Sequence, residues 1–114
     1  MKKQTTKQSS AARTIKKYVA ASNKHDVKSI LACFADDAVV HDEGEKLRGK
    51  KAIEGWIVKT IEKYKFQFKL LGVKGGDAKA VAEIEVSGTF DGSPVTLDYH
   101  FTIGNGKILS LAIK

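Results

Sequence analysis

Apolar residues in the first half of the chain recur every three or four positions, the spacing that gathers them on one face of an α-helix. The first such stripe predicts a helix over about residues 11–22, and its members are Ile15, Tyr18, Val19 and Ser22. Asp26 can cap a second, short helix, because a carboxylate there can accept from the free N–H groups of the first turn. The apolar face of this second helix consists of Val27, Ile30, Leu31 and Phe34, and the pair Asp36-Asp37 is predicted to end it.

The middle of the chain is predicted to hold one short strand and one long helix. Residues 38–40 are typical of a strand, and the polar stretch over residues 41–51 is predicted to be irregular. A third helix follows, because large apolar residues again share one stripe with lysine and glutamate on the other side. That stripe consists of Ile53, Trp56, Ile57, Ile61 and Tyr64.

From Lys65 onward the hydrophobic period becomes two, which predicts four strands separated by three turns. The inward-facing rows are Phe66, Phe68 and Leu70, then Ala82, Ile84 and Val86, then Val95, Leu97, Tyr99, Phe101 and Ile103. Helices followed by an antiparallel meander define an α+β domain, with the N-terminal helices packed on one face of a curved, mainly antiparallel sheet. Where a twisted sheet and its helices diverge, a cavity is expected.

The turns predict how the strands pair. A three-residue loop within residues 74–77 would pair residue 68 with 84 and set Lys69 across from Glu83. A two-residue turn at Gly92-Ser93 would place Val86 against Tyr99. The turn at Asn105-Gly106 leaves two alternatives: a two-residue hairpin would turn the last strand's apolar row outward, and a three-residue loop would bury it. We expect burial of that row, which is Leu109, Leu111 and Ile113.

Length and charge distribution limit the classes of function. The 114 residues suffice for one domain, which we place at residues 11–114. Six bases and no acid in residues 1–17 carry +6 of the net charge of +7, so residues 1–10 are predicted to be a disordered basic arm ahead of a near-neutral domain. We therefore do not expect nucleic-acid binding by the domain. The single Cys33 and the lack of an apolar run of about 20 residues predict a cytoplasmic protein without a membrane partner.

One stretch in the first half of the chain carries a resemblance to a known family. The run Phe34-Ala35-Asp36-Asp37-Ala38-Val39-Val40-His41-Asp42, followed by Leu47-Arg48-Gly49 and Ala52-Ile53, resembles SnoaL-like members of the nuclear transport factor 2 superfamily. The resemblance covers about residues 12–113. It implies a cone-shaped roll, whose open end binds a small, mostly apolar molecule. The superfamily includes ketosteroid isomerases, polyketide cyclases and non-catalytic binding or dimerisation modules, so the fold alone does not choose among them.

Ketosteroid isomerase is the informative comparison within that superfamily, because residues 18–42 can be laid on it without a gap. Tyr18 falls on its oxyanion-hole tyrosine and Asp42 on its general base, so the resemblance implies catalytic roles for both. The family's second, protonated aspartate would lie near Phe101, and a pocket tyrosine is replaced by Ile57 beside Trp56. Without that second donor, steroid isomerisation itself is not expected.

The resemblance and the inward rows together predict a ligand-binding set of Tyr18, Val40, Asp42, Trp56, Phe68, Leu97, Tyr99 and Phe101. Alternation along the strand directs the Asp42 carboxylate toward the cone mouth, where desolvation would raise its pKa. The alternative is that Asp42 caps the loop that follows. No metal and no cofactor are expected, since His41, Asp42 and Glu43 do not converge from an extended strand, and neither a Gly-rich phosphate loop nor a Cys-x-x-Cys motif is present.

Two functions follow from these residues. The first is a small-molecule-binding protein that acts as an acid/base isomerase or cyclase on a small apolar carbonyl compound, with Asp42 moving a proton and Tyr18 stabilising an oxyanion. The alternative is a non-catalytic ligand-binding or dimerisation module. A homodimer is expected through the outer face of the sheet, with His100 opposite Glu85, in a mixed polar row of Thr96, Asp98, His100 and Thr102.

Overall fold

The computed structural model describes residues 10–114. Segments with apolar residues every three or four positions form helices in it, and segments with a period of two form strands. The expected basic arm at residues 1–10 lies outside the described residues, apart from Ser10, where the first helix begins. The elements in chain order are α1 (Ser10–Asn23), α2 (Val27–Leu31), β1 (Phe34–Asp42), β2 (Glu45–Arg48), α3 (Lys50–Tyr64), β3 (Gln67–Gly75), β4 (Lys79–Ser87), β5 (Val95–Gly104) and β6 (Lys107–Ile113).

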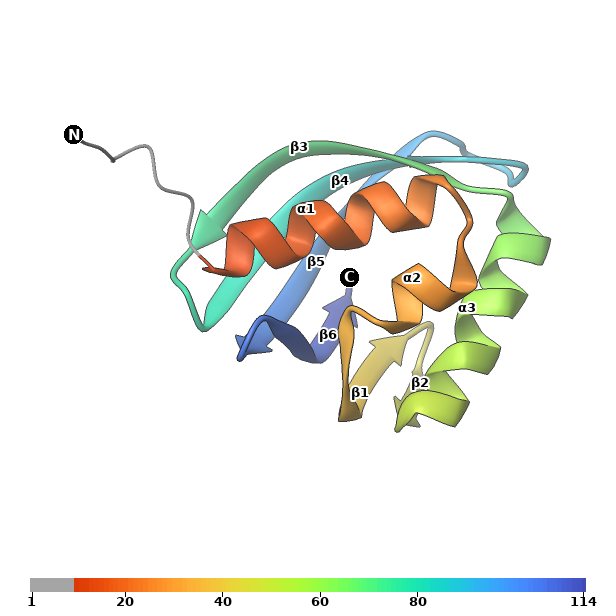
Figure 1. Ribbon diagram of the computed structural model, residues 1–114. Helices are drawn as coiled ribbons and strands as arrows, with labels where there is room; N and C mark the ends of the chain where they lie inside the picture. The colour runs from red at the N-terminus through yellow and green to blue at the C-terminus, as the bar shows by residue number, and fades with distance from the viewer. Residues whose placement is uncertain (1–9) are drawn as a thin grey trace.

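The strands form one curved sheet in the order β2-β1-β6-β5-β4-β3. All neighbours are antiparallel except β1 and β6, which run parallel. Figure 1 shows the sheet bending over α1, with α2 and α3 beside the β1–β2 end. The α+β prediction, with N-terminal helices on a curved and mainly antiparallel sheet, is therefore confirmed.

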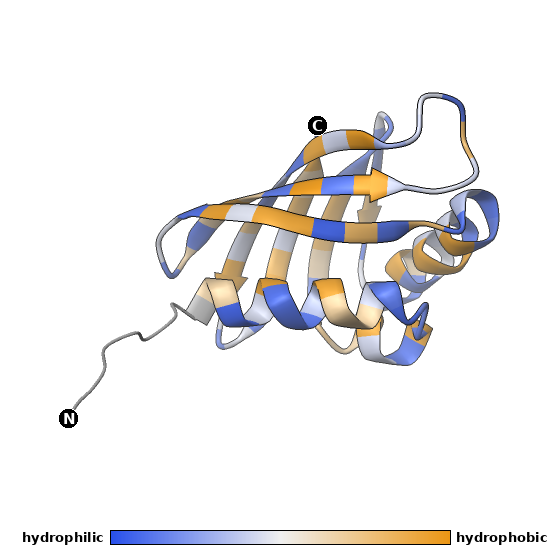
Figure 2. Cartoon of the chain, turned by 90° about the horizontal axis from the view of Figure 1, so that it is seen from above, coloured by the Kyte–Doolittle hydropathy of each residue, from blue (hydrophilic) through white to orange (hydrophobic). Residues whose placement is uncertain are grey.

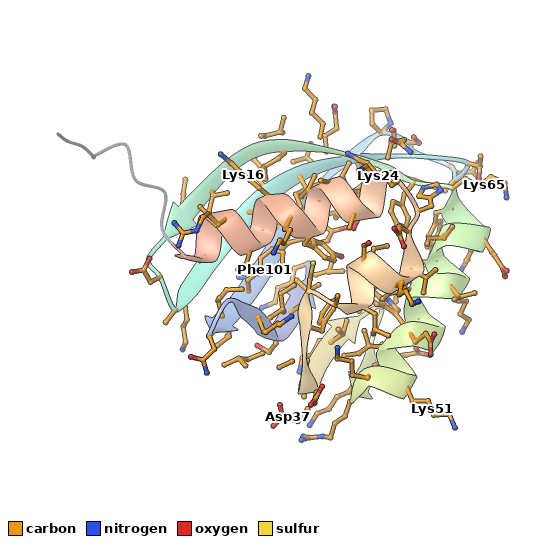
Figure 3. The ribbon with its side chains drawn as sticks, viewed as in Figure 1. Lys16, Lys24, Asp37, Lys51, Lys65 and Phe101 are labelled. Atoms are coloured by element: carbon orange, nitrogen blue, oxygen red, sulfur yellow. The ribbon has the colours of Figure 1, made fainter. Side chains whose placement is uncertain are left out.

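The core fills the space between α1 and the concave face of the sheet. Along the strands, apolar and polar residues alternate as the period of two requires (Figure 2). Figure 3 shows Phe101 inside the fold beneath α1, while Lys16, Lys24, Lys51 and Lys65 project outward. The largest fully buried side chains come from both layers and include Ile15, Ile30, Phe34, Ile53, Ile84, Phe101, Ile108 and Leu111.

The second helix and the strand after it differ from the sequence prediction. Asp26 caps α2 as expected, since its carboxylate accepts from the Ser29 backbone N–H at 3.2 Å. The helix nevertheless ends at Leu31, and Phe34 already belongs to β1, where it lies opposite Ile108 of β6. Asp36 and Asp37 lie inside that strand, in the irregularity of its pairing, and so do not end the helix. Pairing with β6, which lies far along the chain, outweighs the local helical spacing.

The segment predicted to be irregular, residues 41–51, forms a hairpin instead. Asp42 pairs with Glu45, so the connection is the two-residue turn Glu43-Gly44. Both residues have positive φ, at 50° and 79°, which is the backbone of the tight turns that join twisted antiparallel strands. This hairpin brings Glu43 next to Asp42 at the end of β1.

The pairing of β3 with β4 differs from the predicted register by two residues. Phe68 lies opposite Val86, and Lys69 lies opposite Glu85 in place of Glu83. The connection is longer than predicted, since Gly75 pairs with Ala80, and a bulge at Leu71 restores the match of apolar rows. Opposite charges still meet on the outer face.

The pairing of β4 with β5 also differs, because the connection is a long loop. Val86 lies opposite Val95 in place of Tyr99. The loop folds onto the end of α3, where the Thr89 backbone N–H donates to the Tyr64 carbonyl at 2.8 Å. A side chain at Gly88 would collide with that carbonyl, so glycine permits the close approach.

The last turn combines features of both alternatives. Gly104 pairs with Lys107 around a two-residue turn at Asn105-Gly106, so the expected three-residue loop is wrong. An irregularity in the β5–β6 pairing lies at Leu109 and leaves that side chain exposed. Ile108 before it and Leu111 after it both face the core. Leu111 is fully buried and Ile113 packs against the core, so the expected burial is confirmed for these two and wrong for Leu109.

None of the helices within residues 10–114 combines the length and apolar character that a bilayer-spanning helix requires.

Candidate functional site

A cavity of about 230 Å³ lies between the helices and the inner face of the sheet. Its wall is mostly apolar, and that part of the wall consists of Ile30, Trp56, Ile57, Phe66, Phe68, Val86, Phe90, Val95, Leu97 and Ile113. Polar atoms reach the cavity from Tyr18, Ser22, Asp42, Glu43, Thr60, Tyr64 and Tyr99. An apolar pocket with a few convergent polar groups is the usual form of a small-molecule site.

The structure brings six of the predicted pocket residues together around this cavity, namely Tyr18, Asp42, Trp56, Phe68, Leu97 and Tyr99. Val40 and Phe101 do not line it. They are 0% and 2% exposed, and they belong to the core, where Phe101 packs edge-on against Tyr18 with ring centres 5.7 Å apart. A residue on an inward-facing row can thus lie in the core behind the lining residues and support them without contacting a ligand.

Asp42 stands at the end of β1, where it contacts both the cavity and the tryptophan of α3. The Trp56 indole N–H donates to its Oδ2 at 3.0 Å. Partial burial raises the pKa of the Asp42 carboxyl, opposed by the Trp56 hydrogen bond, and the neighbouring Glu43 charge raises it further. The alternative, in which Asp42 caps the following loop as a charged acceptor, predicts a depressed pKa, so titration of this carboxyl distinguishes the two.

Two phenols share the cavity with Asp42. Tyr18 of α1 is 3% exposed and Tyr99 of β5 is 4% exposed, and their ring centres are 6.5 Å apart. Burial raises the pKa of both phenols, and the Asp42 charge adds to that rise in each. Both phenols therefore keep their protons at neutral pH and can donate hydrogen bonds to a ligand.

Three lining residues that the sequence analysis did not assign to the site are Glu43, which is exposed, and Tyr64 and Phe90, which are half-buried, and we call these three the cavity mouth. The Tyr64 hydroxyl donates to Glu43, 3.1 Å from Oε1 and 3.0 Å from Oε2, which links α3 to the β1–β2 hairpin. Phe90 of the β4–β5 loop packs edge-on against the Tyr64 ring, with centres 5.7 Å apart. Tyr64 already belonged to the predicted apolar stripe of the third helix, and the Glu43-Gly44 turn was the signal that could have placed Glu43.

The Trp56 hydrogen bond gives a test of this electrostatic balance. Substituting Trp56→Phe keeps an aromatic ring against the carboxylate and removes the only donor atom that the indole supplies. Because that hydrogen bond lowers the pKa of Asp42, its loss is expected to move the pKa of the carboxyl further upward. Carboxyl-carbon NMR titration measures this shift, and Trp56→Phe with an unchanged or lower Asp42 pKa would contradict the arrangement.

Among residues 10–114, no group of three or more histidine, cysteine or carboxylate side chains is placed to hold a metal ion. Cys33 is buried and its thiol donates to the Ser29 carbonyl at 3.4 Å, away from the cavity lining. The polar chemistry available at the cavity is therefore that of carboxylates, phenols and hydroxyls.

Comparison with solved structures gives close matches over almost the whole chain. Protein SMa1630 from Sinorhizobium meliloti, a proposed polyketide cyclase, is 36% identical, with a TM-score of 0.86 over 94% of this chain and 100% of that one. Xcc0381 from Xanthomonas campestris pv. campestris, also a proposed polyketide cyclase, is 20% identical, with a TM-score of 0.82 over 91% of this chain and 88% of that one. Rv0760c from Mycobacterium tuberculosis, in complex with estradiol-17beta-hemisuccinate, is 18% identical, with a TM-score of 0.80 over 93% of each chain.

No curated protein sequence matches the chain. The sequence profile of the SnoaL-like domain matches residues 15–111, which include all helices and strands except the first five residues of α1 and the last two of β6. This match and the relative at 36% identity agree with the resemblance in the FADDAVV and RGxxAIxxW segments. The chain therefore belongs to the SnoaL-like domain family.

Proposed function

We propose that this protein binds a small apolar carbonyl compound in the cavity and moves a proton on it, as an isomerase or cyclase does. The observation that carries the proposal is the partly desolvated Asp42 carboxylate, which faces the same cavity as the protonated Tyr18 phenol. A carboxylate with a raised pKa is a better general base at neutral pH than a free aspartate. A phenol that donates to the carbonyl oxygen stabilises the enolate formed when the neighbouring C–H loses its proton.

Three polar groups each have one part in this mechanism. Asp42 accepts the proton from the carbon next to the carbonyl and returns it, and Trp56 holds the carboxylate in place through the 3.0 Å hydrogen bond. Tyr18 donates to the oxygen on which negative charge develops. The apolar wall excludes water, which strengthens both interactions.

The comparisons support a small-molecule ligand. The relative at 36% identity is a proposed polyketide cyclase. Rv0760c, which shares this fold, was crystallised with a steroid ester. These relatives support a ligand with much apolar surface, in keeping with the aromatic and aliphatic lining of the cavity, and do not determine its size or charge here.

Deuterium exchange tests the proposal without knowledge of the natural substrate. The protein is incubated with β-tetralone in heavy water, and NMR follows the loss of the protons beside the carbonyl. We expect exchange faster than the buffer reaction, rising with pH as Asp42 loses its proton. A rate equal to the buffer reaction at saturating β-tetralone would contradict proton transfer.

A specific observation favours the alternative, a ligand-binding module without turnover. Phe101 lies near the position that the resemblance gives to the family's second acidic donor, and its enclosed ring supplies no hydrogen-bond donor. Saturable binding of β-tetralone without any exchange would select this alternative.

Self-association through the outer face of the sheet remains a prediction. The row of Thr96, Asp98, His100 and Thr102 lies on that face, although His100 is opposite Val81 and Ala112 and not opposite Glu85. A dimer is expected in sedimentation at micromolar concentration, and Thr96→Arg should weaken it by placing charge in the contact. The matched control is Val58→Arg on the exposed side of α3, which should leave the dimer intact. A wild-type monomer would contradict the prediction.

A further inference from the structure

We infer that the cavity selects an uncharged carbonyl compound of one or two rings, whose oxygen is held by the Tyr99 hydroxyl, and that carboxylate ligands are repelled at the mouth. The inference rests on the function proposed above, since both place the ligand in the same cavity. It adds the size, the charge and the polar anchor of that ligand.

The volume of the cavity limits the size of the ligand. A buried apolar cavity of about 150 Å³ is known to hold benzene. At the same density of filling, the 230 Å³ available here holds roughly nine or ten carbon atoms, which is one substituted ring or two fused rings. Four fused rings would extend through the mouth, where the Tyr64–Glu43 hydrogen bond and the Phe90 ring stand.

Tyr99 supplies the anchor. Its side chain lines the cavity and is 4% exposed, and within residues 10–114 the structure gives its hydroxyl no hydrogen-bond partner. In the proposed reaction the Tyr18 hydroxyl stabilises the negative charge that develops on the oxygen, so its main effect is on the rate, and Tyr99 is assigned to binding of the uncharged ligand. A buried hydroxyl without a partner is costly, and a ligand oxygen that accepts from it removes that cost. The preferred ligand therefore carries an acceptor that reaches the Tyr99 side of the cavity.

The charges around the cavity determine which polar groups can enter. Asp42 and Glu43 both lie in its lining, and among residues 10–114 no lysine, arginine or histidine does. The cation near the mouth, Lys63, lies over the Tyr64 ring with its ammonium 5.1 Å from the ring centre, and it does not belong to the lining. A ligand carboxylate would meet two like charges in an apolar environment, where their repulsion is strong. An uncharged carbonyl adds no third negative charge, and its oxygen can accept from the phenol hydroxyls in the lining.

The test compares four probes on the full chain: naphthalene, β-tetralone, β-naphthoate and androstenedione. Affinities are measured from the amide NMR signals of the protein. We expect β-tetralone to bind about tenfold more tightly than naphthalene, the difference that one hydrogen bond makes, and at least tenfold more tightly than β-naphthoate. Androstenedione at its solubility limit should not displace β-tetralone. Equal binding of β-naphthoate, displacement by androstenedione, or no binding of β-tetralone would each overturn the inference.

Two variants assign these preferences to residues. Tyr99→Phe removes one oxygen, so β-tetralone should lose its tenfold advantage while naphthalene binds as before. The naphthalene titration of the same variant is the matched control, because it reports any general change of the cavity that does not involve the carbonyl oxygen. Glu43→Gln should improve β-naphthoate binding without changing that of β-tetralone. If the advantage of β-tetralone survives in Tyr99→Phe, the anchor is wrong.

These readouts do not depend on turnover. A protein that binds β-tetralone through Tyr99 but exchanges no protons upholds the inference and contradicts the proposed proton transfer. A protein that exchanges protons, but whose affinities do not change with Tyr99→Phe or with ligand charge, upholds the proposed proton transfer and contradicts the inference.

Discussion

Substituting Asp42→Asn is expected to slow proton exchange on β-tetralone by about 100-fold or more, because amides are not bases and general base catalysis contributes at least this much. The amide keeps the size of the carboxylate, and its oxygen can still accept from the Trp56 indole. Binding of β-tetralone should therefore change little. An exchange rate within a few-fold of the wild type would exclude Asp42 as the base.

The same substitution, although it slows exchange, is expected to preserve or raise the free energy of unfolding at neutral pH. Because burial raises the pKa of Asp42, the folded chain holds this proton more tightly than the unfolded chain, whose aspartate titrates at about 3.9. Wild-type stability from this group is thus fully present below the unfolded pKa and is lost as pH rises through the raised folded pKa. Asp42→Asn lacks this loss, so at neutral pH it should be as stable as the wild type or more stable.

Urea unfolding of both proteins from pH 3 to pH 8 measures this difference. We expect the free energy of unfolding of the wild type, relative to Asp42→Asn, to decline with pH across that window. Asp98→Asn, on the exposed outer face, is the matched control for replacing a carboxyl by an amide. A variant that is less stable than the wild type at neutral pH would indicate a charged cap and remove the case for catalysis.

The sequence was sufficient for the element types and the inward rows, because these depend on periodicity, which is local. Prediction from the sequence failed where contacts with distant segments determine the element type or the strand register. Phe34 has helical spacing from Ile30, yet it becomes a strand residue because β6 pairs with it. The β4–β5 register depends on the hydrogen bond from Thr89 to the end of α3, which no local pattern reports.

The candidate site shows the same division. Tyr18 and Asp42 could be proposed from family resemblance, and the structure places both in one cavity. The Trp56–Asp42 hydrogen bond and the Tyr64–Glu43 contact join α3 to the β1–β2 hairpin, so predicting them required a strand that the sequence analysis had taken as irregular. Residues on an inward row could not be divided into wall and core, since alternation gives the face of a residue and not its depth.

Phe101 is the residue for which this distinction has the largest expected consequence. Its ring is fully enclosed, stands edge-on to Tyr18 at 5.7 Å and stacks against Tyr99 at 6.4 Å. Phe101→Ala should cost about 3–5 kcal/mol of stability, since the lost contacts and the new cavity add together. That is a large part of the stability of an average domain, so the milder Phe101→Leu provides a folded variant, with a cost of about 1.5 kcal/mol.

Phe68→Leu is the matched comparison, because Phe68 is an aromatic residue of the same inward face that lines the cavity. If Phe101 supports the pocket from behind, Phe101→Leu should lower the free energy of unfolding while the affinity for β-tetralone changes less than in Phe68→Leu. Urea unfolding and the NMR titration measure the two quantities in the same samples. Should Phe101→Leu leave stability within about 0.5 kcal/mol and weaken binding instead, the ring would be a wall of the pocket, as the sequence had predicted.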